Sequence, residues 1–413
     1  MKKLTLPQET NDLLAWIDRQ QKSLVDTLVD WANINSGSTH IAGIDRYRDK
    51  LAHAFAPLLT PSDYSATVAL PPLAQINDHG ECIQTPITDG LLIRKRPELT
   101  NRVLLCGHLD TVYPENHPFQ TCQFIDNNTL NGPGVADMKG GILVMLTALQ
   151  AFEQHLSAKN IGWDVYLSPD EEIGSQSSAS VFPQFSGHAF GLIYEPSLPG
   201  GEFVGQRKGS GNFTIVVKGK AAHAGRAFYD GRNAIAKLAS LVHDLHQLND
   251  PNQTTTLNIG TIQGGQALNV VPDLAIARFN IRVESDTAAT QVLQQVDALI
   301  QRHSDSDYQI ERHGKMTRPA KPMDSKQQSL FTALQQVNEH LGLSTQVIAT
   351  GGCCDGNNLK ALGLANIDTL GVRGGNIHSD SEYVLLDSLS ERSKISTLLL
   401  LGYANQWFNL DSS

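Results

Sequence analysis

Three short apolar runs, each followed directly by polar residues, constrain the fold of this 413-residue chain more than any other feature. The runs cover 102–107, 161–168 and 189–195, and the segment 138–156 between the first two is apolar almost all round. Such runs are typical of strands buried on both faces, and a helix without a polar face has to lie inside the molecule. Strand, helix and strand in succession predict an α/β unit with a mostly parallel sheet flanked by helices.

A second pattern occupies the middle of the chain. From 205 to 316 the predicted order is strand, helix, two strands, helix and strand, which is the order of a ferredoxin-like α+β unit. The first pattern resumes after Pro319 with a helical segment at 325–341. We therefore expect one domain made of 1–204 and 317–413, with 205–316 inserted as a smaller domain.

Composition narrows the classes of partner. The net charge is −10, the isoelectric point is about 5.7, and no basic stripe is present, so nucleic acid and anionic membrane are poor partners. The first residues include two lysines but no apolar h-region, and we expect no membrane-spanning segment. Five cysteines without a paired framework predict a reduced, cytoplasmic protein.

Polar side chains follow each of the three predicted strands. His108 and Asp110 come after the first, Glu171 and Glu172 after the second, and Glu195 ends the third. Ligands of open α/β sheets bind outside the carboxyl ends of the strands, so we expect these side chains to converge in one crevice. Each residue taken alone is more often a turn or surface residue, but their placement after three successive strands favours a shared site.

Two more residues complete the set of candidate metal ligands, namely Asp137 before the apolar helix and His378 in a glycine-rich loop. Imidazole and carboxylate together suit zinc, with manganese and cobalt as close competitors. One ion with an open position rarely needs so many ligands, whereas two ions that share a bridging carboxylate would use them. Asp137 is the candidate bridge because the start of a helix fixes its backbone.

The spacing of neighbouring polar residues suggests further roles. His108 and Asp110 leave the same face of an extended backbone, so Asp110 can accept the second N–H of the imidazole and orient the ring. Glu171 and Glu172 leave opposite faces, so one can bind metal while the other acts as a general base.

Eight motifs occur in the order typical of a known enzyme family. They are GHLDTV, GVADMKGG, DEEIGS, YEP, GKAAHAG, NVVP, TGG followed by Asp, and HSDSEYV. With these motifs the chain resembles the di-zinc amidohydrolases, which include the carboxypeptidase G type glutamate carboxypeptidases, acetylornithine deacetylase, succinyl-diaminopimelate desuccinylase and aminoacylase. It looks most similar to the carboxypeptidase G type. The resemblance implies a catalytic domain, 1–204 and 317–413, that holds two Zn²⁺ per chain, with Co²⁺ or Mn²⁺ as alternatives.

The same resemblance implies how the ligands are shared. Five side chains would hold the two ions: His108, Asp137 and Glu195 at one, and Asp137, Glu172 and His378 at the other. Glu171 would be the general base, and Asp110 would orient His108. The peptide bond between Asp137 and Met138 is expected to be cis.

By resemblance, the inserted domain (205–316) acts as a lid and dimerisation domain. His223 would reach the active site of a partner subunit and stabilise the oxyanion of the tetrahedral intermediate. Arg282 and Asn269 would grip a carboxylate of the substrate, for which a planar guanidinium is well suited. Gly352 would lie in the loop that contacts the substrate.

Two stretches depart from the family pattern. The loop TGGCCDGNN carries Cys353 and Cys354 where relatives tend to have Gly followed by Ser or Thr, and we interpret both thiols as small packing residues. The strand FNIR has Asn280 where an aspartate often stands.

Together these features predict a homodimeric hydrolase that cleaves an amide bond next to a free carboxylate in an N-acyl amino acid or a short peptide. One alternative is a two-metal phosphoesterase, which would need basic groups near the site. The candidates for those groups are Arg207, Lys208, Arg226 and Arg232. The other alternative is a homologue that binds metal or an acyl amino acid without turnover, a case that usually shows broken ligand positions.

Overall fold

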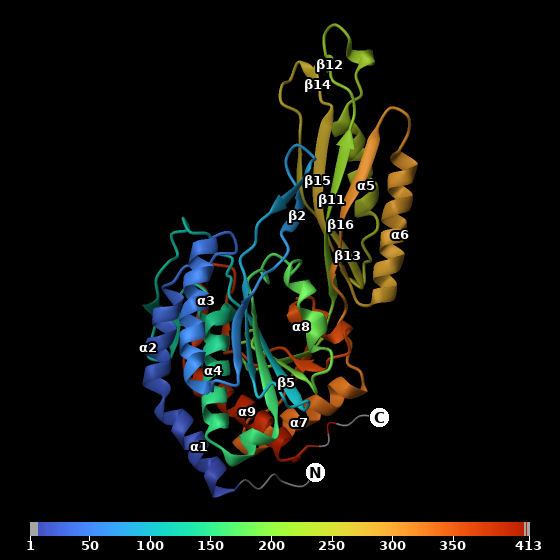
Figure 1. Cartoon of the computed structure of the whole chain (residues 1–413). Coiled ribbons are helices and arrows are strands. Elements are labelled where there is room, and N and C mark those ends of the chain that lie inside the picture. Colours follow the sequence, from blue (N-terminus) through green and yellow to red (C-terminus); the bar gives the residue numbers. More distant parts are fainter. Residues whose placement is uncertain (1–6, 409, 411–413) are drawn as a thin grey trace.

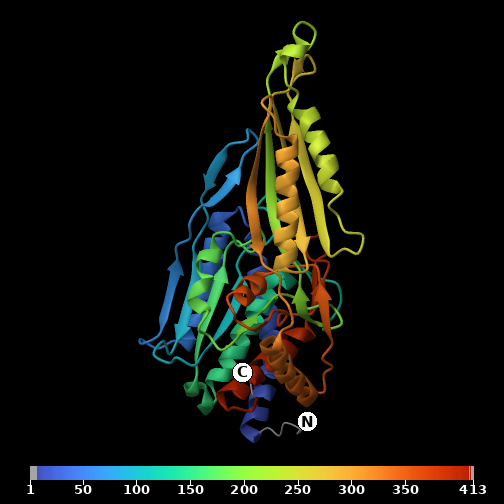
Figure 2. The ribbon, with the colours of Figure 1, turned by 90° about the vertical axis from the view of Figure 1, so that its right-hand side faces the viewer.

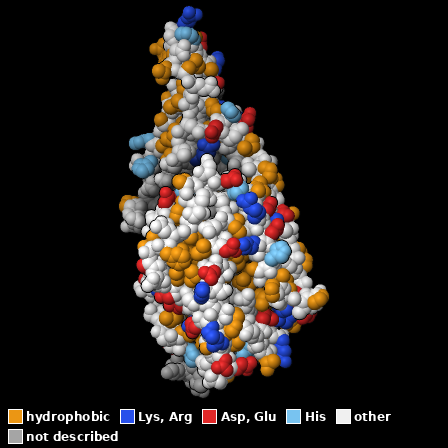
Figure 3. Space-filling model, turned by 90° about the vertical axis from the view of Figure 1, so that its left-hand side faces the viewer, with side chains coloured by type: hydrophobic (Ala, Val, Ile, Leu, Met, Phe, Trp, Pro, Cys, Tyr) orange, Lys and Arg blue, Asp and Glu red, His pale blue; other side chains and the backbone are white. Residues whose placement is uncertain are grey.

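The structure is a computed structural model that describes residues 7–408 and 410, and it consists of a broad larger unit and a narrow smaller unit that projects from it (Figure 1). A space-filling view shows the smaller unit tapering away from the larger one (Figure 3). The first helix, α1 (Gln8–Arg19), and the last, α9 (Asp387–Ala404), both lie in the larger unit. The smaller unit is therefore an insertion into the larger one.

The larger unit is built on a six-stranded sheet with the order β1-β4-β8-β5-β9-β18. Three of its pairings are parallel, and two antiparallel pairings add β4 and β1 at one edge. The prediction of an α/β unit with a mostly parallel sheet is thus confirmed. The strands are β1 (Tyr64–Val68), β4 (Gly90–Lys95), β8 (Gly162–Ser168), β5 (Arg102–His108), β9 (Gly191–Ile193) and β18 (Asn366–Ile367).

Helices cover both faces of this sheet, and alternation along β5 supplies a core to each. Val103 and Leu105 belong to the core on the side of the long helices, whereas Leu104 and Cys106 pack on the opposite side against short helices. The long helices are α1, α2 (Gln21–Ala32), α3 (Ile41–Phe55), α4 (Gly140–Glu153), α7 (Ser325–Leu341) and α9. The short ones are η4 (Ser178–Ser180), η5 (Phe182–Phe185) and α8 (Asp355–Ala361).

The apolar segment before and within α4 corrects one expectation. Among the described residues, one helical stretch, Val135–Glu153, is long and apolar enough to cross a membrane, although none was expected. It is almost entirely buried, and α4 packs against α9, α1 and α2. Its apolarity on all sides follows from this central position.

The smaller unit, hereafter the inserted unit, is a four-stranded antiparallel sheet with the order β13-β15-β11-β16. Its two helices cover one face and share one core with the sheet (Figures 1 and 2). This order and connectivity confirm the ferredoxin-like prediction. The elements are β11 (Gly209–Lys218), α5 (Ala234–His246), β13 (Thr255–Gly264), β15 (Leu274–Val283), α6 (Asp286–His303) and β16 (Gln309–Arg318).

The inserted unit has a tip far from the larger unit and a base next to it, and a short two-stranded sheet lies at each end. At the tip, β12 (Ala222–His223) pairs with β14 (Val270–Val271) (Figure 1). At the base, β10 (Phe203–Arg207) pairs with β17 (Val347–Thr350).

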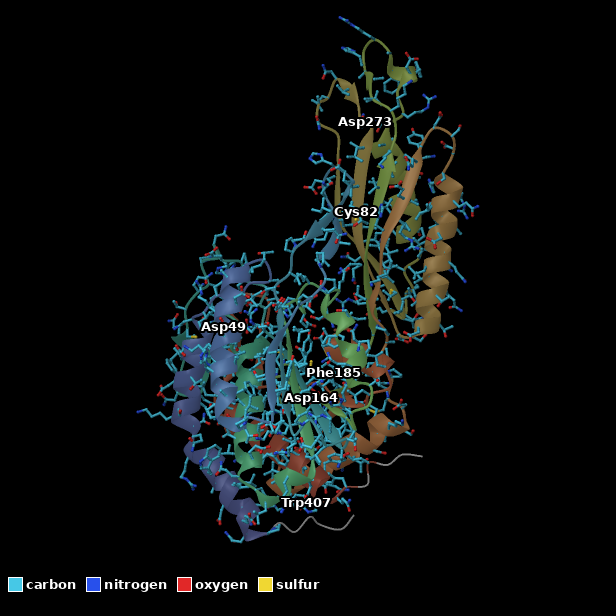
Figure 4. All side chains as sticks on the ribbon, viewed as in Figure 1. Asp49, Cys82, Asp164, Phe185, Asp273 and Trp407 are labelled. Carbon is cyan, nitrogen blue, oxygen red and sulfur yellow. The ribbon has the colours of Figure 1, made fainter. Side chains whose placement is uncertain are left out.

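A hairpin of the larger unit, β2 (Leu73–Ile76) and β3 (Cys82–Thr85), reaches the open face of the inserted sheet. Cys82 marks it in Figure 4. The Arg278 guanidinium donates from Nη2 to the Ile76 carbonyl oxygen at 3.0 Å and to Asp78 Oδ1 at 2.9 Å. These contacts hold the hairpin against the inserted unit.

Candidate metal centre

Two groups of ligand atoms lie at the carboxyl ends of the central strands and share one carboxylate. His108 is the last residue of β5, and its Nε2 lies 3.1 Å from Asp137 Oδ1 and 3.8 Å from Glu195 Oε2. On the other side, His378 Nε2 lies 3.2 Å from Asp137 Oδ2 and 3.3 Å from Glu172 Oε2. Within each group the ligand atoms all lie within 4.8 Å of one another. The two oxygens of Asp137 therefore face different groups, as a bridging carboxylate does.

The donor set fits two divalent cations. Among the described residues, Asp137, Glu172 and Glu195 form ion pairs only with the two imidazoles, and with no lysine or arginine. Glu172 Oε1 is buried and has no hydrogen-bond partner in the described part of the chain. Buried carboxylates without a partner are costly, and imidazole with carboxylate oxygen is a ligand set for zinc, manganese or cobalt.

The pKa values in this cluster show how strongly its charges interact. Burial raises the pKa of Glu172 to about 8, and hydrogen bonds to Asp137 and Glu172 raise the pKa of His378 to about 10. Burial would raise the pKa of Asp137 as well, but hydrogen bonds from His108 and His378 hold it below its usual range. Because such ligands bind metal in their deprotonated form, metal affinity at this cluster should depend on pH.

The backbone around Asp137 is set by the turn before α4. The residues Val135–Lys139 form a kinked turn in which Asp137 and Met138 have non-helical backbone angles, and the Asp137–Met138 peptide bond is cis, as the family resemblance implied. The amide nitrogens of Ala136 and Asp137 donate to Glu382 Oε1 at 2.9 and 3.0 Å. The bridging carboxylate therefore projects from a backbone that another acid holds in place.

Asp110 contacts His108 and also the loop after β8. His108 Nδ1 lies 2.9 Å from the main-chain oxygen of Asp110 and 3.4 Å from its carboxylate, so the main-chain oxygen is the closer acceptor. The carboxylate instead accepts from the amides of Glu171 at 3.1 Å and Glu172 at 3.2 Å, and from Ser38 Oγ at 2.8 Å. Asp110 thus holds the backbone of the two glutamates, because its side chain turns toward the loop after β8.

Glu171 belongs to neither ligand group. Its Oε1 accepts from Arg318 Nη2 at 2.6 Å, and the same nitrogen lies 2.9 Å from its main-chain oxygen. Burial raises the pKa of Glu171, Arg318 lowers it, and Glu195 raises it further. A buried carboxylate beside the ligand groups, with one oxygen held by a guanidinium, can take up a proton through its other oxygen.

The residues expected to bind substrate lie at two ends of the inserted unit. His223 and Asn269 are at the tip, where the Ala224 amide donates to the Asn269 main-chain oxygen at 2.9 Å. Arg282 is at the base, opposite Ser210 on β11. Within one chain the structure does not bring Asn269 and Arg282 together, because nearly the whole length of β15 separates them.

Arg282 contacts the glycine-rich loop at the base instead. Its Nη1 donates to the Gly351 main-chain oxygen and lies 4.0 Å from Cys353 Sγ. Gly352 is exposed in this loop, and its main-chain oxygen accepts from Arg207 Nη1 at 3.3 Å. Cys354 is buried and caps the start of α8.

The cations that a phosphoesterase would need are mostly engaged elsewhere. Arg207 pairs with Asp368 through Nε at 2.7 Å, and Arg232 pairs with Asp307 at 2.7 Å. Lys208 donates to the Gln253 main-chain oxygen. Arg226 is exposed on the inserted unit, in the turn that follows His223. Three of the four candidate cations are thus held by other groups of the protein, and the fourth lies outside the site, which argues against a phosphate site built from them.

Sequence reasoning missed three buried residues of the site. Glu382 stands four residues after His378 within HSDSEYV, so an acid inside a ligand motif was a signal that went unused. Arg318 stands directly before Pro319 at the end of β16, with no local pattern to mark it. Tyr113 OH lies 2.7 Å from Glu382 Oε2, a contact between segments that no spacing reveals.

Comparison with known proteins points to one family. The model of an M20 peptidase dimerisation domain matches residues 205–307. The chain is 29% identical over 318 residues to the succinyl-diaminopimelate desuccinylase of Hahella chejuensis. This alignment covers 71% of this chain and 80% of that protein. The chain is 25% identical over 304 residues to carboxypeptidase G2 of a Pseudomonas species, covering 72% and 73%. These matches support the M20 family of metallopeptidases and amidohydrolases for this chain.

Solved structures of M20 proteins and related peptidases share this fold. A tripeptidase of Staphylococcus aureus superposes with a TM-score of 0.72 at 21% identity, covering 94% of this chain and 99% of its own. A dinuclear metal-binding M20 peptidase of Bacillus subtilis superposes with a TM-score of 0.62 at 16% identity, covering 93% and 98%. The match over nearly the full length of both includes the larger unit and the inserted unit.

Proposed function

We propose that this protein hydrolyses an amide bond next to a free carboxylate and releases an amino acid. The observation that carries the proposal is the pair of ligand groups that share Asp137, with the largely buried Glu171 beside them and part of neither. Its substrates would be N-acyl amino acids or short peptides, as in a deacylase or a carboxypeptidase. Its physiological metal would be zinc, with cobalt or manganese as substitutes.

The ligand groups and Glu171 would divide the chemistry. When bound, the two ions would polarise the substrate carbonyl and lower the pKa of the attacking water. Glu171 would take the proton of that water and deliver it to the leaving nitrogen. Arg318 would hold one oxygen of Glu171, which leaves the other oxygen for the proton.

The partner subunit would complete the site. His223 and Asn269 stand side by side on an exposed tip that projects away from the metal groups of their own chain. In a homodimer formed through residues 205–316, the tip of one chain would reach the metal cleft of the other chain, in the domain made of 1–204 and 317–413. Arg282 and the loop at Gly352 would then hold the substrate carboxylate from within the same chain, and Asn269 from the partner.

Location and other partners stay predictions of the sequence. We propose a cytoplasmic enzyme that acts on small molecules and binds neither nucleic acid nor membrane, because the acidic chain has no basic stripe.

The test is a hydrolysis screen of N-acyl amino acids and dipeptides with zinc, manganese and cobalt supplied separately. Glu171→Ala should keep both metals and lose about 10²- to 10⁴-fold in kcat, the usual contribution of a general base. Metal content measured on the same preparations is the control. Normal turnover by this variant would show the base assignment to be wrong. Binding of acyl amino acids by wild-type protein without any product would favour a non-catalytic homologue.

A further inference from the structure

Glu382 is a buried acid that none of the proposed chemical steps uses. Its side chain is 1% exposed, and it lies directly behind the bridging Asp137. Among the described residues no lysine or arginine forms an ion pair with it. A buried carboxylate without a cation persists only if hydrogen bonds replace its water.

Those hydrogen bonds come from the segment that carries the bridge. Oε1 accepts from the amides of Ala136 at 2.9 Å and Asp137 at 3.0 Å, and Oε2 accepts from the amide of Gly134 at 3.1 Å. Gly134 has a φ of 71°, a left-handed conformation that lets successive amides point to one side. The backbone of 134–137 thus forms a small anion-binding concavity, and the anion that fills it is Glu382.

The fourth donor links Glu382 to the two histidine segments. Tyr113 OH lies 2.7 Å from Glu382 Oε2 and 2.9 Å from the main-chain oxygen of Ser379. Tyr113 follows His108 by five residues, and Ser379 follows His378 directly. The Glu382 amide also donates to the Ser379 oxygen at 3.0 Å. The Glu382 carboxylate therefore contacts the segments of His108 and Asp137, and Glu382 itself belongs to the segment of His378, so one residue links the shared bridge and both imidazoles.

We propose that Glu382 is a positioning residue that sets the Asp137 carboxylate relative to both imidazoles before metal binds, so that affinity for both ions depends on it. This inference rests on the metal site of the proposed function. It concerns how tightly the ions are held, whereas the proposed function concerns what the loaded site does. A ligand already in place loses less conformational freedom on binding, which raises affinity.

A glutamate suits this position better than its closest substitutes. A carboxylate accepts hydrogen bonds at both oxygens. In Glu382→Gln one oxygen becomes an NH₂ group, so a donor would face either the amides of Ala136 and Asp137 or the amide of Gly134, and those hydrogen bonds would be lost. Glu382→Asp keeps both oxygens but shortens the reach. Tyr113→Phe removes a single donor and leaves the three backbone contacts in place.

The experiment measures zinc binding directly, by competition with a chromophoric chelator, in the full-length protein stripped of metal. Glu382→Gln should weaken zinc binding at both sites by about 10- to 100-fold, Glu382→Asp by less, and Tyr113→Phe measurably but by less than about 10-fold. Asp164→Asn is the matched control, because Asp164 is equally buried within the sheet of the larger unit (Figure 4) and contacts no ligand. It should lower the midpoint of thermal unfolding without changing zinc affinity.

Two results would overturn the inference. One is a Glu382→Gln protein that unfolds at lower temperature, as Asp164→Asn does, but binds zinc like wild type. The other is weakening at one site only. If Glu382→Gln does not fold, the zinc affinity of Tyr113→Phe tests the inference instead, since an unchanged affinity in that variant also contradicts it. A wild-type protein that binds two zinc ions and hydrolyses no amide would refute the proposed function and leave this inference standing.

Discussion

The metal cleft and the tip of the inserted unit gather polar residues in opposite ways. In the cleft, His108, Asp137 and His378 come from segments up to 270 positions apart and meet within hydrogen-bond distance. At the tip, His223 and Asn269 lie on or next to the paired strands β12 and β14 and are exposed, and neither belongs to a group of candidate metal ligands among the described residues. This difference is the basis for the proposal that the cleft is assembled by one chain, whereas the tip acts on another.

The largest expected effect is on kcat, and it can be tested with one variant in the tip and one in the cleft. His223→Ala should lower kcat by about 10²- to 10³-fold, as removal of an oxyanion donor does. If the tip acts in trans, co-expressing His223→Ala with Glu171→Ala, and isolating the mixed dimer through two different tags, should restore about half of the wild-type activity. One site of that dimer combines an intact Glu171 with an intact His223, and the other has neither.

His53→Ala, an exposed histidine on α3, serves as the control and should be fully active. A mixed dimer as inactive as its parents, or a monomeric enzyme with normal turnover, would show that the tip is not part of the site.

A smaller effect tests the division of substrate binding between the base and the tip. Arg282→Lys should raise KM by about 10- to 100-fold with little change in kcat, because the ammonium loses a bidentate contact to the substrate carboxylate. Arg312→Lys, whose guanidinium pairs with exposed Asp297 on the helix side of the inserted unit, is the matched control. Steady-state kinetics with one N-acyl amino acid suffice. An unchanged KM would remove Arg282 from the substrate site.

The smallest effect on activity is expected at Asp368, a buried acid that is paired with an arginine and a lysine, but its effect on stability should be clear. Asp368 is fully buried and lies 2.7 Å from Arg207 Nε and 2.7 Å from Lys321 Nζ, in contrast to the acids of the cleft. Burial opposes ionisation, but Arg207 and Lys321 lower the pKa of Asp368 to about 2. Asp368→Asn should cost about 3 to 5 kcal/mol in the free energy of unfolding, since it leaves two buried cations unpaired.

The pH dependence of that cost follows from the direction of the shift. The folded-state pKa lies below the unfolded value of about 3.9, so the stabilisation is complete above pH about 4 and is lost as the pH falls through about 2. Denaturant unfolding of wild type and Asp368→Asn should therefore give free energies that converge in this range. A difference that stays constant down to pH 2 would contradict the assignment.

Local patterns were enough to predict the architecture and the types of ligand. Apolar runs such as 102–107 report burial on both faces of a strand, because hydrophobicity and period are properties of a few adjacent residues. The same holds for the strand and helix order of the inserted unit. The contacts of Asp110 with the amides of Glu171 and Glu172, and the role of Glu382, escaped prediction because they depend on which backbone amides lie within reach in the folded chain.

The sequence by itself determined that this chain forms an α/β unit with a ferredoxin-like insertion, and that imidazoles and carboxylates follow its buried strands. Those facts are encoded in residue type and spacing, which act over a few positions. Only the tertiary structure decided that the two oxygens of Asp137 face different ligand groups, that Arg318 holds Glu171, and that Asn269 and Arg282 stand at opposite ends of the insertion. Such relations join distant segments, so they exist only once packing has fixed the distances between atoms that the sequence leaves far apart.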